Sequence, residues 1–170
     1  MQNPDQIDLY FEPLRQSSLE RCASEEEFKL VLKAYDFAKD AHKNQKRISG
    51  DPIILHNIDV ARIVVDEIGL GYKSIITALL HHILTDTEYT WEDISGMFGR
   101  KVAELVVGLG KMERVFAAQD KTQEETFKQM LLTVNNDIRV LLIKLADRLH
   151  NLRNLQELPV ARATLHLYRS

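Results

Sequence analysis

Apolar residues recur at helical spacing along most of this chain, and short polar stretches mark where each helix ends. A capping-box pattern at Ser24 and Glu27 begins a helix predicted to run to about residue 43. The same periodicity predicts further helices over 54–68, 72–85, 91–98, 101–110, 123–132 and 137–156. Because we find no alternating strand pattern and no internal repeat, the sequence predicts an all-α fold, a single helical bundle.

Gly and Pro residues place the loops and suggest how the chain is divided. Residues 45–52 read as a loop that carries two adjacent cations, and 117–121 read as a second loop. Pro4 and Pro13 limit any helix near the start, so we expect residues 1–24 to be an extension that covers a domain of residues 25–158. Pro159 is expected to begin a further helix over 159–170, and the lack of a capping signal after it suggests a chain cut from a longer protein.

Composition narrows the class of protein. The chain has 170 residues, of which 45% are apolar and 28% charged, as expected for a globular domain with its own core. A net charge of −3 gives no support to direct nucleic-acid binding. The single cysteine, Cys22, excludes an internal disulfide framework. With neither a signal peptide nor a long apolar run, we expect a cytoplasmic protein with no membrane partner.

Candidate chemistry begins in the segment 72–85, which is apolar except near its end. At about 100° per residue, His81 shares a helical face with Thr85, and His82 shares the adjoining face with Asp86. These four polar groups can converge on a buried site. A helix end frayed into solvent is the plain alternative, with both histidines as ordinary surface or core residues.

A second candidate is Asp147, which lies in the apolar segment 143–151 with His150 and Asn151 on the same face. Burying a carboxylate is costly unless it is paired, so Asp147 needs a partner such as a metal, Arg148 or a helix end. A salt bridge on a half-exposed helix would explain the pattern as well.

The order of these residues carries a family resemblance. His56, then His81 followed by one residue, then Asp147 resembles the H…HD…D pattern of the HD metal-dependent phosphohydrolases. More narrowly, four segments look like the N-terminal hydrolase domain of long Rel/SpoT proteins, which synthesise and hydrolyse the alarmones ppGpp and pppGpp. The segments are 34–42, the loop 45–52 with His56, 78–86 and 143–153, and the likeness runs from about residue 25 to the end.

The resemblance implies a Mn²⁺ site in a bundle of helices. Its ligands would be His56, His81, residue 82 and Asp147, and the ion would activate water to remove the 3′-pyrophosphate of the alarmone. Position 85 and Asp86 would orient water and handle protons. The family positions that hold the nucleotide are matched by Arg47, Ser49 and Asn151, with Lys46 and Arg148 as further phosphate contacts.

The chain departs from the family where the chemistry is done. The Asp of the His-Asp pair is His82 here, and the Glu-Asp pair is Thr85-Asp86. Three histidines and one carboxylate favour softer ions than Mn²⁺. Loss of a general base costs about 10²- to 10⁴-fold in rate. Further departures are Ile53 for a tyrosine, Val107 for an aspartate and Gly110 for a threonine.

These departures favour a hydrolase-inactive N-terminal domain of a Rel/SpoT-type GTP pyrophosphokinase in alarmone metabolism and the stringent response. Its role would be structural or regulatory toward a C-terminal synthetase domain beyond Ser170. Two alternatives stay open. One is an active Mn²⁺-dependent (p)ppGpp 3′-pyrophosphohydrolase, and the other is an HD phosphohydrolase that acts on another nucleotide.

Overall fold

Helices follow one another along the chain in the computed structural model, which describes residues 4–117, 122–134 and 137–155. The elements are α1 (Pro4–Arg21), α2 (Glu25–Ala41), α3 (Ile53–Arg62), the π-helix η1 (Ile63–Ile68), α4 (Tyr72–Leu80), α5 (Ile83–Asp86), α6 (Trp91–Phe98), α7 (Arg100–Ala117), α8 (Gln123–Val134) and α9 (Arg139–Leu155). Over these residues no strand forms, although Lys46 and Pro52 make an isolated antiparallel bridge. The predicted all-α fold is confirmed.

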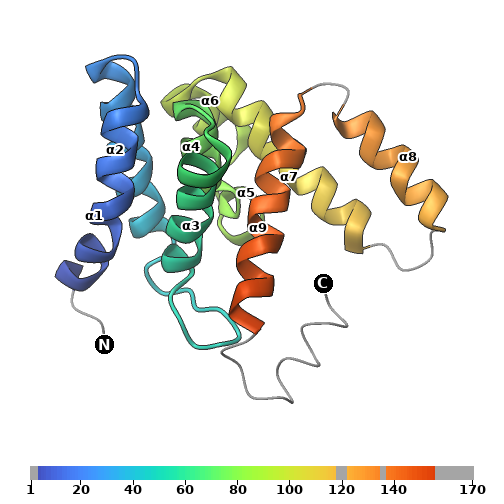
Figure 1. The fold of residues 1–170 in the computed structure, drawn as a ribbon, viewed down its shortest axis with the longest axis horizontal. Coiled ribbons are helices and arrows are strands. Elements are labelled where there is room, and N and C mark those ends of the chain that lie inside the picture. Colours follow the sequence, from blue (N-terminus) through green and yellow to red (C-terminus); the bar gives the residue numbers. More distant parts are fainter. Residues whose placement is uncertain (1–3, 118–121, 135–136, 156–170) are drawn as a thin grey trace.

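The core lies around α3 and α4, which pack against each other in the middle of the bundle (Figure 1). Helices α1 and α2 cover one side of this pair, and α7 and α9 pack on the other. Fully buried aliphatic side chains from these helices fill the space between them, among them Ile58, Ile75, Leu79, Leu105 and Ile143. Helices from distant parts of the sequence are therefore held at fixed positions around α3 and α4.

The predicted helix 54–68 is present, but its last turn is wider than an α-helix. α3 continues into η1, and the segment ends at Gly69, whose φ of +83° is a conformation that favours glycine. The amide of Leu70 donates to the carbonyl of Val64 and closes the end. The wide turn lies against α9 and α1.

The helix predicted over 72–85 is not continuous, and in this respect the prediction was wrong. α4 ends at Leu80 with His81 as its C-cap, and α5 begins at Ile83 with His82 as its N-cap. His82 has a φ of −100° and a ψ of 2°, outside the helical region. The two histidines thus lie at a break between helices rather than on adjoining faces of one helix.

The expectation that Pro4 and Pro13 limit helix formation near the start was also wrong. Pro4 occupies the first position of α1, where its missing N–H costs nothing, and Pro13 lies inside the helix. A proline in a helix interior costs about 3 kcal/mol. Packing offsets this cost, because Phe11 and Leu14 are buried and the Phe11 ring stacks on Tyr35 at 3.7 Å between centroids.

Helix α7 is longer than predicted because Gly108 and Gly110 lie inside it rather than ending it. At Gly108 the side chain of Val140 on α9 comes so close that an added Cβ would lie 2.9 Å from its Cγ2. The absence of a side chain at residue 108 lets α7 and α9 pack closely. Of the predicted loop 117–121, Ala117 is helical. Residues 118–121 and the helix expected over 159–170 lie outside the described residues.

If α1 is part of the core, Leu14→Ala should lower the free energy of unfolding by about 2–5 kcal/mol, the cost of emptying a buried leucine site. Leu9, which lies on the same helix with 73% of its surface exposed, provides the control variant Leu9→Ala. Urea denaturation of both proteins measures the difference. Equal stabilities would contradict the assignment of α1 to the core.

The glycines of α7 allow a matched pair of substitutions. Gly110→Ala adds a methyl group in open space and should stabilise the helix by about 0.5–1 kcal/mol. Gly108→Ala must push Val140 away, and overpacking of this kind costs about 1–3 kcal/mol. Thermal unfolding should therefore rank Gly110→Ala above the unmodified protein and Gly108→Ala below it. The close packing is refuted if both alanines stabilise equally.

Candidate metal centre

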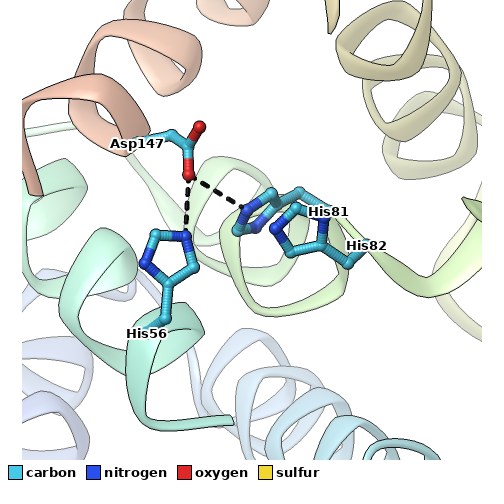
Figure 2. A group of neighbouring side chains, drawn as sticks. All are labelled: His56, His81, His82 and Asp147. Atoms are coloured by element: carbon cyan, nitrogen blue, oxygen red, sulfur yellow. Dashed lines mark hydrogen bonds and ion pairs between the residues drawn. The ribbon is translucent and has the colours of Figure 1, made fainter. Parts of the chain in front are cut away.

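Four side chains meet between α3, the α4–α5 break and α9. They are His56, His81, His82 and Asp147, and one donor atom from each lies within 4.8 Å of the others (Figure 2). His56 comes from the first turns of α3, and Asp147 from the middle of α9. The convergence predicted from the sequence is thus present for these residues.

Asp147 is the centre of the cluster. Its Oδ1 lies 2.7 Å from His56 Nε2 and 3.5 Å from His81 Nε2, the contacts drawn in Figure 2. Lys144 Nζ contacts the other oxygen at 3.3 Å. Burial works against ionisation of this carboxyl, but the facing imidazoles of His56 and His81 outweigh it and hold the pKa of Asp147 well below its ordinary value. Asp147 is therefore a buried anion with one oxygen turned toward the histidines.

His81 is held in one orientation by its own helix. Its Nδ1 lies 2.6 Å from the carbonyl oxygen of Ala78, and a carbonyl only accepts, so Nδ1 carries a proton. In the neutral ring Nε2 is then an acceptor. That Nε2 is buried and has no hydrogen-bond partner among the described residues. When the ring is neutral, the Nε2 lone pair faces the carboxylate oxygen of Asp147, an arrangement that a shared cation would stabilise.

The break between α4 and α5 lets two consecutive histidines face the same cluster. On a continuous helix they would point about 100° apart. Here the rings of His81 and His82 lie 3.9 Å apart between centroids, and the His82 ring lies 5.9 Å from that of His56. Burial lowers the pKa of His82 well below its ordinary value, and it lowers the pKa of His56 to about 4 against the opposing effect of Asp147. Both rings are therefore neutral near pH 7, as a metal ligand must be.

These residues fit a divalent cation. The unpartnered His81 Nε2 and the oxygen of Asp147 are two acceptors that a shared cation would satisfy, and His56 and His82 add further nitrogen donors. Three imidazoles and one carboxylate form a donor set typical of zinc and related borderline ions, whereas Mn²⁺ prefers more oxygen. The geometry supports a metal site, and the types of donor atom indicate which ion would fit it.

A cavity of about 880 Å³ opens onto the cluster. His56, His82 and Asp147 line it on the cluster side. The residues that the sequence assigned to a nucleotide line the same cavity, namely Lys46, Arg47, Ser49 and Asn151. Arg148, the further phosphate contact suggested by the sequence, lies outside this lining although it follows Asp147 on α9.

The loop before α3 carries Arg47 into this cavity. Arg47 and Asp51 hydrogen-bond through their backbones, and Gly50 makes the turn with a φ of +93°. The guanidinium donates to Asn151 Oδ1 at 2.5 Å, which joins the loop to α9. Burial lowers the pKa of Arg47, with the nearby Asp147 acting in the opposite direction. The Arg47 guanidinium is thus a fixed positive charge in the cavity lining, beside the metal cluster.

The pair Thr85-Asp86 does not join the cluster. Both side chains are exposed, and the Thr85 hydroxyl donates to the His82 carbonyl and to Asp86 Oδ1, each at 3.2 Å. The prediction that His81, His82, Thr85 and Asp86 converge was therefore half right, because the helix break separates the last two from the first two. Asp86 still lines the cavity.

The sequence interpretation missed a set of polar residues behind His56. His56 Nδ1 lies 2.7 Å from His150 Nδ1, and His150 Nε2 lies 2.9 Å from Asp59 Oδ2. The Tyr10 hydroxyl donates to Asp59 Oδ1 at 2.6 Å. A signal was present, because His56 and Asp59 are three residues apart on one helix and Asp147 and His150 are three apart on another. Two such pairs on buried helices indicate facing polar surfaces.

Known proteins match this chain over most of its length, including the residues of the cluster. A family model described as "HD domain" matches residues 34–170. The "Bifunctional (p)ppGpp synthase/hydrolase SpoT" of Escherichia coli strain K12 is 41% identical over 165 residues, which is 93% of this chain and 23% of that protein. The "GTP pyrophosphokinase rsh" of Brucella melitensis is 40% identical over 146 residues, covering 82% of this chain and 19% of its own. The chain thus spans about a quarter or less of these relatives.

A solved structure gives the same result for the fold. It belongs to a study described as "A metazoan ortholog of SpoT hydrolyzes ppGpp and plays a role in starvation responses". The two chains are 26% identical with a TM-score of 0.59, over 81% of this chain and 79% of the other. Among the described residues of this chain, no helix is both long and apolar enough to cross a membrane.

The cluster should bind a zinc-class ion, and Co²⁺ reports such binding by its visible absorption. We expect Asp147→Asn to weaken Co²⁺ binding by at least about 100-fold, since it removes the only carboxylate of the cluster. Asp86→Asn is the matched control, because Asp86 lines the same cavity outside the cluster. Equal Co²⁺ affinities for the two variants would place the metal elsewhere.

Proposed function

The chain belongs to the HD domain family, as the HD region of Rel/SpoT (p)ppGpp enzymes, and we propose that it is an inactive hydrolase domain with a structural or regulatory role. In this proposal the domain keeps its cation site and its alarmone pocket, but it lacks the groups that complete hydrolysis. The regulated partner is a C-terminal synthetase domain. The proposal rests on one observation, the side chains that stand at positions 82 and 85.

Position 82 bears on how the metal and substrate are held. The family pattern has an Asp ligand there, whereas this chain has a buried neutral imidazole. The cluster then supplies one negative charge to a divalent ion. Fewer anionic oxygens make the site a poorer match for Mn²⁺ and a better match for zinc-class ions.

Position 85 bears on proton transfer. A hydroxyl cannot serve as a carboxylate base, and that of Thr85 is occupied by the His82 carbonyl and Asp86. The remaining carboxylate, Asp86, is exposed to solvent, so its charge is screened by water. The chemistry that a divalent cation supplies at such a site is Lewis-acid polarisation and activation of water. Of the two positions that would guide that water, position 85 is changed here and only Asp86 is retained.

The nucleotide pocket supports retained binding. Lys46 and Arg47 supply positive charge along the cavity, and Asn151 fixes the Arg47 guanidinium, whose flat face suits stacking on guanine. Ser49 lines the same wall. Binding without turnover would make the domain a sensor of (p)ppGpp. The sensed ligand could then influence synthesis through contacts between domains.

An active Mn²⁺-dependent (p)ppGpp 3′-pyrophosphohydrolase is the second candidate. The observation in its favour is that His56, His81 and Asp147 keep their relative positions, with Asp86 still in the cavity. An HD phosphohydrolase for another nucleotide would use the same residues. Turnover of a nucleotide panel separates these candidates from the inactive domain.

The test compares the unmodified protein with a restored site. Without substitution, no pyrophosphate should be released from ppGpp in the presence of Mn²⁺ above a protein-free control. The double variant His82→Asp with Thr85→Glu should gain Mn²⁺ binding. Its rate of ppGpp hydrolysis should exceed that of the unmodified protein by about 10²-fold or more, the contribution of a general base. Pyrophosphate-release assays and Mn²⁺ titration measure the two effects.

A matched control carries His82→Asn with Thr85→Gln, which has similar shape but no added charge. It should stay inactive. Clear hydrolysis by the unmodified protein would overturn the proposal in favour of the active enzyme, and an inert restored variant would place the defect at other positions.

A further inference from the structure

A line of polar groups, joined by hydrogen bonds and one ion-pair contact, leads away from the metal cluster through His56. It passes from His56 Nδ1 to His150 Nδ1 at 2.7 Å and from His150 Nε2 to Asp59 Oδ2 at 2.9 Å. Tyr10 on α1 donates to the other oxygen of Asp59 at 2.6 Å. His56 and His150 are buried, whereas Asp59 is partly exposed. The line therefore connects the cluster to a carboxylate near the surface.

A cation bound at the cluster fixes where the protons along this line lie. The cation takes the lone pair of His56 Nε2, so the proton of the neutral His56 ring is on Nδ1. That N–H can only donate to His150 Nδ1, which must then be an acceptor. A His150 ring with one proton then carries it on Nε2, which faces Asp59 Oδ2 in an ion-pair contact of 2.9 Å. With one proton on each ring, this arrangement fits the bound cation, the hydrogen bond between His56 and His150 and the contact with Asp59.

Asp59, at the other end of the line, also influences where the protons of the two rings lie. Because an ionised carboxylate only accepts, Asp59 favours a proton on His150 Nε2 and leaves Nδ1 free to accept from His56. We propose that Asp59 is a positioning residue of the metal centre, which acts through His150 to fix the tautomer of His56 and direct its Nε2 lone pair into the cluster. This inference rests on the cation site of the proposed function, but it does not depend on whether that site hydrolyses anything.

A neighbouring amide contacts the same nitrogen of His150 and opposes the effect of Asp59. Asn154 Nδ2 lies 3.2 Å from His150 Nε2. A donor at that nitrogen would favour the opposite tautomer of His150, with its proton on Nδ1 facing His56. The His56 proton would then move to Nε2 and block the metal. Asp59 is closer and charged, so of these two neighbours it has the stronger electrostatic influence on the proton at His150 Nε2.

The experiment uses zinc and the tautomers of the two rings. In ¹⁵N-histidine-labelled protein loaded with Zn²⁺, NMR should show His150 protonated at Nε2 and accepting at Nδ1. In Asp59→Asn the new amide can donate to His150 Nε2, so the signals should shift toward the reversed tautomer. Zinc affinity, measured by competition with a chromophoric chelator, should fall by about 10- to 100-fold, as for other residues that orient a metal ligand.

Two controls separate positioning from general stability. Glu67 of η1 pairs with Arg153 of α9 at 2.7 Å, so Glu67→Gln removes one charge between the same parts of the fold and should leave zinc affinity unchanged. In a His150→Gln background, Asp59→Asn should have no further effect, because the intermediate ring is gone. Should Asp59→Asn fail to fold, Asp59→Leu removes the acceptor and takes its place.

Several results would overturn the inference. These are a zinc affinity of Asp59→Asn no lower than that of Glu67→Gln, an unchanged His150 tautomer, an undiminished effect in the His150→Gln background, and an unmodified protein that binds no zinc. Hydrolysis of ppGpp by the unmodified protein would overturn the proposed inactivity alone, since neither the tautomers nor the zinc affinity is measured through turnover.

Discussion

The buried carboxylate of Asp147 faces imidazole nitrogens, and its charge must be balanced there. Lys144 balances one oxygen, and the other is left to the histidines. His81 directs its Nδ1–H to the Ala78 carbonyl, so a neutral ring has no second proton to offer to Asp147. The need to balance the negative charge of this one carboxylate thus accounts for the grouping of donors around it. The helical core packs α3, α4 and α9 against one another and so keeps these donors together.

Binding a cation and using it are different requirements, and the proposed function separates them. Neutral nitrogen ligands, fixed in orientation by their surroundings, are enough for affinity. Turnover also needs oxygen ligands that leave the ion acidic toward water, and a base placed beside it. In this chain the first set of groups is retained, whereas the second is reduced to the exposed Asp86. Under the proposed function, the domain would respond to a nucleotide rather than consume it.

Periodicity and capping residues predicted nearly all of the helices, and the order of His56, His81 and Asp147 predicted that they meet. Local patterns could not reveal the break at His81 and His82, because it depends on where the cluster lies in three dimensions. α1 was missed for a similar reason. The local cost of Pro13 is visible in the sequence, whereas the packing of Leu14 that offsets it is not. The contact between Asp59 and His150 required knowing that α3 faces α9.

The break between α4 and α5 also changes how the cluster gathers its ligands. His81 and His82 are consecutive, so once one ring holds an ion, the peptide link delivers the other at a high effective concentration. With a cation at the cluster, the pair would act as one chelating unit. By contrast, His56 and Asp147 are separated by 91 residues and are brought together only when the bundle folds. An ion captured early by the chelating pair would therefore favour the later docking of α3 and α9, and it would link metal supply to the assembly of the domain.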